Sequence, residues 1–355
     1  MPVKLLISIT FFLFLSCSTL TSVNKPTSKV VNSLAWQGDK HLWVSQGNQI
    51  IRWNTQTKET QTYENISGQL LVDTQDNLWV LGTNIVHSFD GQRWQSFTPD
   101  DNFVGGSVLS YIETDSNIWL GTFGLSHYIP QSNAWEIIMS KIPKPQRIQD
   151  NQGGFVEGLL EGVHSIALES PESIWIGTNH GLTHITNDAI QTWDNMILDS
   201  EGVRCLLIVN NDIWACSSKG VGIWSGTTWY NFVELSTPIY IAQGMNNDIW
   251  VATWESGVAR WDGSSWNVWT DGEGISGERI TSFLVSDLGD VWVGTKTGIS
   301  RWNGQRWKVY NTSQGLTSEY ITVLYQSPNG TLWAGTLAGD INYYNPDSDF
   351  WYSFP

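Results

Sequence analysis

The sequence is poor in charged residues and in cysteine. Only 15% of its 355 residues are charged and only three are cysteines, a composition that excludes both a charge-rich disordered chain and a small disulfide-dense scaffold. Basic residues are the scarcer kind, because 18 Lys and Arg stand against 34 Asp and Glu and give a net charge of −16. Such an acidic surface repels phosphate groups, so we expect neither nucleic acid nor anionic lipid head groups as partners.

Recognisable catalytic and cofactor motifs are also missing. The sequence has no HExxH, GxSxG, phosphate-loop, CxxC or calcium-loop signature, so we expect no cofactor and no metal site. His180 and His184 are four residues apart, but a turn that enters a strand does not bring such side chains together. An enzyme is therefore only the alternative. A lyase or glycan-cleaving enzyme would need an acid or base, for which His164 and Glu278 are the first candidates.

The longest hydrophobic run lies near the N-terminus and has about a dozen residues, too few to span a bilayer comfortably. With Lys4 before it and Ser16-Cys17 after it, the segment has the shape of a secretory signal. It resembles a bacterial lipoprotein signal, in which the cysteine carries a lipid, although Phe14 replaces the usual leucine. The alternative is an ordinary signal peptide. We expect an envelope protein, in the periplasm or at the outer surface, with a signal at 1–16, lipidation of Cys17 and a flexible tether at 17–32.

A short phrase recurs along the rest of the chain, as in NLWVLGT at 77–83 and DVWVGT at 290–295. Its tryptophans, called anchors below, are separated by 36, 40, 56, 39, 36, 42 and 41 residues, a period typical of a four-stranded propeller blade. Residues 33–355 are therefore predicted to form an all-β, eight-bladed β-propeller of four-stranded antiparallel blades. The anchors are Trp43, Trp79, Trp119, Trp175, Trp214, Trp250, Trp292 and Trp333.

Turn signals divide each repeat into four strands. Asp90-Gly91, Asp262-Gly263 and Asn303-Gly304 mark the last hairpin of their repeats, because these dipeptides accept the positive φ that a tight hairpin needs. The first repeat already contains four strands and the last ends in FWYSF. We therefore expect the ring to close by packing of the first blade on the last, without a blade shared between the termini.

Most of the 22 tryptophans recur at fixed positions of the repeat. Radial blades leave a gap that widens toward the outside, and large flat side chains fill such a gap while burying about 200 Å² each. This regularity indicates packing residues and not a binding surface. His127 and His184 occupy the place of Arg52, Arg260 and Arg301 in other repeats and are predicted to be polar residues of a blade edge.

Two cysteines, Cys205 and Cys216, lie in one repeat. A two-residue turn at Asn210-Asn211 would place them opposite each other on neighbouring strands, where a disulfide can form in an oxidising compartment. One residue of register slip would separate them. The sequence leaves open a disulfide or two buried free thiols, and we prefer the free thiols.

The repeat resembles the two-component regulator propeller repeat. The resemblance rests on an LWVGT-type strand, a following GΦxRW strand and a GL-containing link, as in TSQGLTSEYITVLY at 312–325, and it covers residues 33–355. In that family such repeats form the periplasmic sensor of hybrid histidine kinases. Because no kinase or receiver segment follows Pro355 in this sequence, the resemblance implies a free-standing sensor-like propeller.

A ligand site is expected where the repeat is broken, at the mouth of the channel. Counted back from the anchors, the residues entering the innermost strands are small or neutral in the first three repeats and hydrogen-bonding, cationic or aromatic in the last five. Trp254 belongs to no packing column and is predicted to be an exposed platform beside Glu255. A loop inserted at 139–162 lies on the same face. The candidate ligand-binding residues are His164, Arg204, Tyr240, Trp254, Glu255, Arg279, Lys296 and Tyr320.

These observations favour an extracytoplasmic binding or sensor-like module. Arg and Tyr grip carboxylates, sugars or a peptide backbone by hydrogen bonding and stacking. We therefore expect a small ligand such as a sugar or peptide, or an envelope protein, as partner, with the membrane contacted only through the lipid anchor. A purely structural envelope scaffold is a further alternative.

Overall fold

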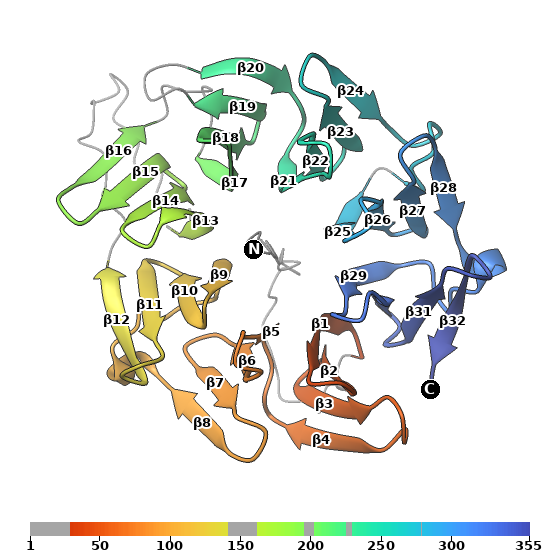
Figure 1. Ribbon diagram of the computed structural model, residues 1–355, viewed down its shortest axis with the longest axis horizontal. Coiled ribbons are helices and arrows are strands. Elements are labelled where there is room, and N and C mark those ends of the chain that lie inside the picture. The colour runs from red at the N-terminus through yellow and green to blue at the C-terminus, as the bar shows by residue number, and fades with distance from the viewer. Residues whose placement is uncertain (1–28, 141–161, 195–201, 225–228, 278) are drawn as a thin grey trace, which may run out of the picture.

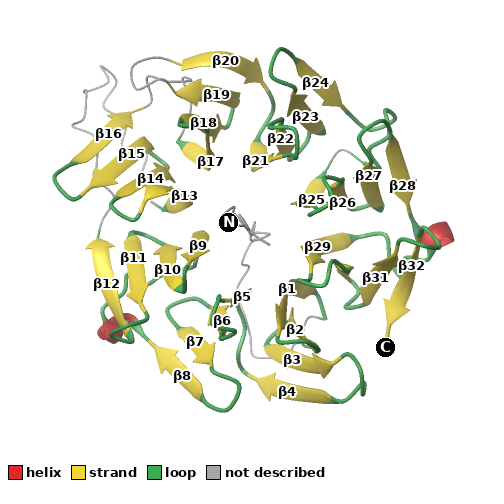
Figure 2. Cartoon of the chain, viewed as in Figure 1, coloured by secondary structure: helices red, strands yellow, loops and turns green. Residues whose placement is uncertain are grey.

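The computed structural model describes residues 29–140, 162–194, 202–224, 229–277 and 279–355. They form eight four-stranded antiparallel sheets arranged as the blades of a ring (Figure 1). Nearly all regular structure is strand, apart from the short 3-10 helices η1 (Pro99–Asp101) and η2 (Thr312–Gln314) (Figure 2). The predicted eight-bladed all-β propeller is confirmed.

Each blade runs from the channel outward in chain order. Blades 1 to 4 consist of β1 (Val31–Gln37), β2 (His41–Gln46), β3 (Gln49–Asn54), β4 (Thr60–Glu64); β5 (Gln69–Val72), β6 (Leu78–Leu81), β7 (Val86–Phe89), β8 (Trp94–Phe97); β9 (Ser110–Thr114), β10 (Asn117–Gly121), β11 (Leu125–Ile129), β12 (Ala134–Met139); β13 (Val163–Ser170), β14 (Ser173–Thr178), β15 (Gly181–Thr186) and β16 (Ile190–Asp194). Blades 5 to 8 consist of β17 (Val203–Val209), β18 (Asp212–Ser217), β19 (Gly220–Trp224), β20 (Trp229–Glu234); β21 (Pro238–Gln243), β22 (Ile249–Thr253), β23 (Val258–Trp261), β24 (Trp266–Trp269); β25 (Ile280–Val285), β26 (Val291–Thr295), β27 (Ile299–Trp302), β28 (Trp307–Tyr310); β29 (Ile321–Gln326), β30 (Leu332–Thr336), β31 (Ile341–Asn345) and β32 (Phe350–Phe354).

This order gives the ring two different faces. Turns between the first and second and between the third and fourth strands of a blade lie on one side, which we call the hairpin face. Turns between the second and third strands, and the links between blades, lie on the other side, which we call the link face. The two faces are separated by the length of the strands, so a site on one is distinct from a site on the other.

The ring closes as predicted, by packing of blade 1 on blade 8. The hydroxyl of Thr322 in β29 donates to the carbonyl of Val31 in β1 at 2.5 Å, and the rings of Trp36 and Trp333 lie 5.9 Å apart. Val31 is fully buried in this contact. β1 therefore begins two residues before the predicted boundary at residue 33.

The glycine of the anchor phrase is required by the spacing of the blades. Gly294 in β26 faces β29 of the next blade, and a Cβ added there would lie 2.8 Å from Cγ2 of Ile321. Gly177 in β14 is placed in the same way, since its Cβ would lie 2.7 Å from the carbonyl oxygen of Val203. Distances this short are repulsive, so a larger residue would push neighbouring blades apart.

The tryptophan columns hold the blades together, as the repeat predicted. Trp250 is buried and lies 6.0 Å from both Trp302 and Trp307 of the next blade, with Trp307 edge-on. Trp292 makes the same type of contact with Tyr344 and Trp351 of blade 8. Edge-to-face pairs of this kind add about 0.5–1.5 kcal/mol each beyond the area they bury.

The predicted polar column at the blade edge packs flat on the anchors. His127 and His184 each stack on the anchor of their own blade at 4.0 Å. The guanidinium of Arg260 lies 5.6 Å from the centre of the Trp250 ring. Each of these side chains pairs with the anchor of its own blade on the neighbouring strand, so their expected position in the blade is confirmed.

Cys205 and Cys216 form a disulfide between β17 and β18. They pair in the register that the turn at Asn210-Asn211 predicts, and both asparagines have positive φ. The register prediction is confirmed, whereas the preference for two free thiols was wrong. The bond fits because the two Cα atoms are 5.0 Å apart, within the range that a disulfide spans.

Several predictions fall outside the described residues. These are the signal at 1–16, lipidation of Cys17, all of the tether up to residue 28, and residues 141–161 of the insertion. Within the described ranges, no helix is long and apolar enough to cross a membrane.

Candidate functional site

A cavity of about 1590 Å³ follows the axis of the ring. The innermost strands of blades 1, 2, 3, 6, 7 and 8 supply much of its wall. Large aromatic side chains from blades 6 to 8 line it, among them Tyr240, Trp254 and Tyr320. A space of this size exceeds what a single small molecule fills and can admit a sugar chain or a peptide segment.

Trp254 lies in the turn between β22 and β23 and carries a cation on its ring. The guanidinium of Arg279, from the link that enters blade 7, lies 5.1 Å from the ring centre. Nη2 of Arg279 is also 3.4 Å from Oε1 of Glu255. Trp254 is therefore partly covered, which corrects the expectation of an exposed platform. Glu255 lies beside it, as predicted.

A second pair of the same kind lies one blade further along the ring. Nζ of Lys296, in the turn between β26 and β27, is 5.4 Å from the ring centre of Tyr320. The backbone of Tyr320 is fixed by the N–H of Leu337, which donates to its carbonyl at 2.9 Å. We call Trp254, Glu255, Arg279, Lys296 and Tyr320 the aromatic mouth. All five lie in turns or links of the link face.

Tyr240 lines the cavity but contributes mainly to packing. Its hydroxyl donates to the carbonyl of Thr281 in the next blade at 3.0 Å, and its ring stacks on Phe283 at 6.2 Å. Burial raises the pKa of this hydroxyl well above its ordinary value. It therefore stays protonated and joins blades 6 and 7.

His164 and Arg204 lie on blades 4 and 5, apart from the aromatic mouth. Nε2 of His164 is 2.5 Å from Oδ1 of Asn179. Burial lowers the pKa of His164, against the effect of this hydrogen bond, and Arg204 lowers it further. The imidazole is neutral at pH 7. Glu278, the other candidate acid or base, lies outside the described residues.

The predicted row of rim residues does not form one structural row. A β-bulge lies at the start of most innermost strands, and the extra residue is His164 in blade 4, Arg204 in blade 5 and Thr281 in blade 7. Arg279 precedes the strand and Tyr240 follows the bulge. Counting back from the anchors failed because the first hairpin varies from two residues in blade 5 to five in blade 6.

The sequence prediction missed one apolar group of the cavity. Leu337, in the turn between β30 and β31, is 39% exposed and lines the cavity beside Tyr320. It follows the GT of its anchor phrase, as Trp254 follows the corresponding AT. The residue that follows each anchor strand could therefore have identified Leu337 as a cavity residue from the sequence.

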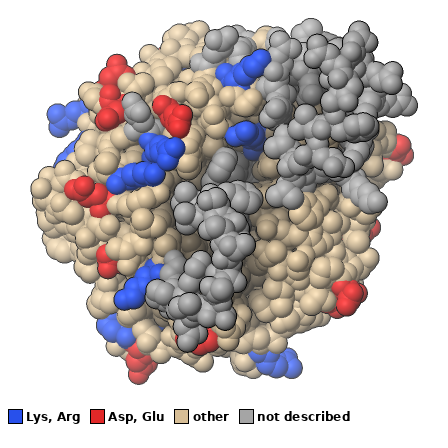
Figure 3. All heavy atoms as spheres, turned by 180° about the vertical axis from the view of Figure 1, so that it is seen from behind, with Lys and Arg blue, Asp and Glu red and all other residues tan. Residues whose placement is uncertain are grey.

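The surface carries both signs of charge. Most Lys and Arg side chains visible in Figure 3 lie in its left half, with Asp and Glu among them. No group of three or more His, Cys, Asp or Glu residues that could hold a metal ion is found in the part of the chain that the structure describes. The link face offers aromatic rings with single charges beside them.

Comparison with protein families finds one match. Residues 315–338, which include the GL-containing link and the anchor strand of blade 8, match the family model described as two component regulator propeller. Blade 8 thus carries a match to the two-component regulator propeller repeat. The resemblance inferred from the sequence is confirmed at this position. No curated protein sequence matches the chain.

Solved structures similar to this propeller include two extracellular domains from B. thetaiotaomicron. That of the putative one component system BT4673 is 19% identical, with 90% of this chain and 46% of that chain covered and a TM-score of 0.48. That of the putative hybrid two component system BT3049 is 16% identical, with 92% and 53% covered and a TM-score of 0.49. This chain spans about half the length of those domains. The WD40 β-propeller domain of Doa1 is 12% identical, with 91% and 94% covered and a TM-score of 0.53, a likeness of fold alone.

Proposed function

We propose that this propeller is a sensor-like binding module that takes a sugar chain or a peptide segment at the aromatic mouth. The observation that supports this most is the presence of two aromatic side chains with cations on them, Trp254 with Arg279 and Tyr320 with Lys296, beside a cavity of about 1590 Å³. Aromatic faces bind sugar rings and peptide groups by stacking, and the cations add hydrogen-bond donors.

The ion pair of Arg279 and Glu255 makes this mouth adaptable. Both side chains are about half exposed, so their pairing contributes little to stability and a ligand can replace it at low cost. A ligand carboxylate or hydroxyl would take the guanidinium, and Glu255 would accept a donor from the ligand. We place this module outside the cytoplasm, attached through Cys17, because the N-terminal segment resembles a lipoprotein signal and an oxidising compartment permits the disulfide.

A thermal-shift screen of the protein against oligosaccharides and peptides tests the proposal. A ligand at a hundred times its Kd stabilises the folded state by about 2.7 kcal/mol and raises the melting temperature. The shift should disappear in the double variant Trp254→Ala and Arg279→Ala. Arg204→Ala is the matched control, because it removes a link-face cation that lies apart from the mouth. An unchanged shift in the double variant would refute the proposal.

A further inference from the structure

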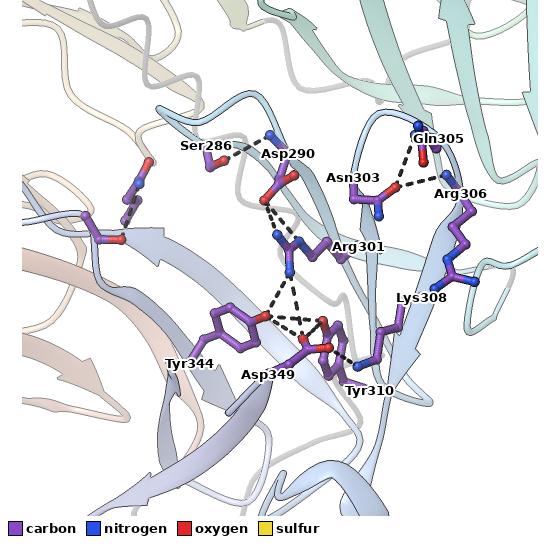
Figure 4. A network of polar contacts seen from close by, with 12 residues as sticks. Ser286, Asp290, Arg301, Asn303, Gln305, Arg306, Lys308, Tyr310, Tyr344 and Asp349 are labelled. Atoms are coloured by element: carbon purple, nitrogen blue, oxygen red, sulfur yellow. Dashed lines mark hydrogen bonds and ion pairs between the residues drawn. The ribbon is translucent and has the colours of Figure 1, made fainter. Parts of the chain in front are cut away.

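Arg52, Arg260 and Arg301 occupy the same position in their blades, paired with the anchor on the neighbouring strand. Two of them are paired with a carboxylate, and Arg52 is not. Arg301 in β27 shows the complete arrangement (Figure 4). Its Nε and Nη2 donate to Oδ2 of Asp290 at 3.0 and 2.7 Å, and its Nη1 donates to the hydroxyl of Tyr344 at 2.8 Å. Asp349 lies 3.8 Å away. The guanidinium charge is neutralised, and each of its three nitrogens donates a hydrogen bond.

Arg260 in β23 is paired in the same way. Its Nε donates to Oδ2 of Asp248 at 2.6 Å, and that aspartate also accepts from the indole of Trp250 at 3.0 Å. Asp248 and Asp290 both stand two residues before the anchor of their blade. An aspartate at this position is therefore the counterion of the blade-edge arginine.

Blade 1 has His41 at the position of that aspartate. The guanidinium of Arg52 lies 5.4 Å from the ring centre of Trp43 and 5.7 Å from that of Phe89 in blade 2. Arg301 lies between Trp292 and Tyr344 at 5.2 and 5.7 Å. Arg52 is thus placed between two rings as Arg301 is. Phe89 occupies the position of Tyr344 but has no hydroxyl to accept a hydrogen bond from the guanidinium.

His41 does not replace the missing carboxylate. Its Nδ1 accepts one hydrogen bond from Nη2 of Arg52 at 3.2 Å. Burial, together with the charges of Arg52 and Lys40, lowers the pKa of His41 despite the opposing effect of Asp76. The imidazole is neutral at pH 7. Within the described residues, Arg52 forms no ion pair and its buried Nε has no acceptor.

Arg52 borders a groove of about 480 Å³ on the hairpin face, between blades 1 and 2. Lys40 and three aspartates also line it. Two of these carboxylates are already used in turns, since Asp76 accepts from the backbone N–H of Gly38 and Asp90 from those of Gln92 and Arg93. The third is Asp39. Two cations and three aspartates give the groove a net charge of −1. The aspartates therefore disfavour a polyanion, and a single added carboxylate would depend on direct pairing with Arg52.

We propose that this groove binds a small monocarboxylate, whose carboxylate pairs with Arg52 from the groove side and supplies the counterion that Asp290 gives to Arg301. Arginine N–H groups form strong, charge-assisted hydrogen bonds with a carboxylate, and Arg52 is a partly buried cation that forms no ion pair within the described residues. Gln56 and Gln75 border the same groove, and their amides can supply polar contacts for the rest of the ligand. The site is on the opposite face from the aromatic mouth and does not depend on it.

Calorimetric titration with two acids tests the site and distinguishes two sources of the carboxylate. The probes are D-glucuronate, a uronic acid, and N-acetylglycine, a capped amino acid. Each is compared with its neutral methyl ester or amide. At least one acid should bind saturably and at least about tenfold more tightly than its neutral form, since a charge-assisted hydrogen bond is worth about that factor. Absence of saturable binding by both acids would overturn the proposal.

Two variants of blade 1 make the test specific. His41→Asp restores the internal carboxylate, so binding should weaken at least about tenfold while the melting temperature rises. Arg52→Gln should also lose binding, and Arg52→Lys, which keeps the charge and the aliphatic stem, guards against loss of folding. Arg260→Gln in blade 6 is the control and should leave binding unchanged. Equal affinity in the wild type and in folded His41→Asp would refute the assignment.

Discussion

Blades 1 and 7 place an arginine in the same position but neutralise it differently. In both blades the guanidinium lies over the anchor tryptophan and beside an aromatic ring of the next blade. In blade 7 two carboxylates and a tyrosine hydroxyl surround it, whereas in blade 1 one imidazole nitrogen does. The repeat therefore determines where the side chain lies, and the residues around it determine whether it stabilises the blade or is left to bind something else.

The network of blade 7 continues into blade 8 (Figure 4). Asp349 accepts from the hydroxyls of Tyr310 and Tyr344 at 2.5 and 2.6 Å and from Lys308. Burial raises the pKa of both tyrosines, so both hydroxyls keep the protons that they donate. Within the described part of the chain, Arg52 forms no hydrogen bond or ion pair with blade 2 and contacts only the ring of Phe89 there. Charge pairing thus stabilises the interface between blades 7 and 8 more than that between blades 1 and 2.

The largest expected effect separates the two arginines directly. Asp290 is only 15% exposed, and Arg301→Gln removes the cation that neutralises it. This substitution should lower the free energy of unfolding by about 2–4 kcal/mol. Arg52→Gln removes a cation that has no carboxylate and should cost less than about 1 kcal/mol, mainly the lost contact with the rings. Urea unfolding of both variants measures the difference. Equal destabilisation would show that Arg52 is neutralised as well as Arg301 is.

Most of the scaffold was predictable from the sequence because it depends on local repetition. The anchors, the hairpin dipeptides and the Asn210-Asn211 turn determine strand positions and register through contacts between residues close in the chain. Closure of the ring between Val31 and Thr322 followed from counting strands. The register predicted that Cys205 and Cys216 lie opposite each other, but it does not determine whether the two thiols are oxidised to a disulfide.

The candidate site was predictable only in part, because its contacts join neighbouring blades. The sequence singled out Trp254 and Arg279 separately, but the stacking of one on the other depends on how far each turn and link extends. Variable hairpins and β-bulges shift such positions by one or two residues. Arg52 was assigned to the correct column, but its missing counterion became visible only when the blades were compared in three dimensions.

Acid should weaken the interface of blade 7 and leave blade 1 less affected. Burial opposes ionisation of Asp349, but hydrogen bonds from Lys308, Tyr310 and Tyr344 outweigh it and lower its pKa to about 2. Because the folded-state pKa lies below the unfolded value, this stabilisation is present above about pH 4 and is lost as the pH falls toward 2.

The size of this acid effect is modest because Asp349 is 42% exposed, so solvent screening reduces it to about 1 kcal/mol. The measurement is the difference in unfolding free energy between the wild type and Asp349→Asn, taken at several pH values between 2 and 7. The difference should be constant above about pH 5 and shrink below pH 4. A difference that does not change with pH would show that the charge of Asp349 adds nothing to its hydrogen bonds.

The smallest expected effect comes from giving blade 1 the hydroxyl that blade 7 has. Phe89→Tyr places a hydroxyl where Tyr344 has its own, within reach of Arg52, and should stabilise the fold by about 0.5 kcal/mol. The gain should be smaller in the background of His41→Asp, where Arg52 already has a carboxylate, and a double-mutant cycle of unfolding free energies measures this coupling. If the gain is the same in both backgrounds, the added hydroxyl does not act through Arg52, and the two blades differ in more than the partners of their arginines.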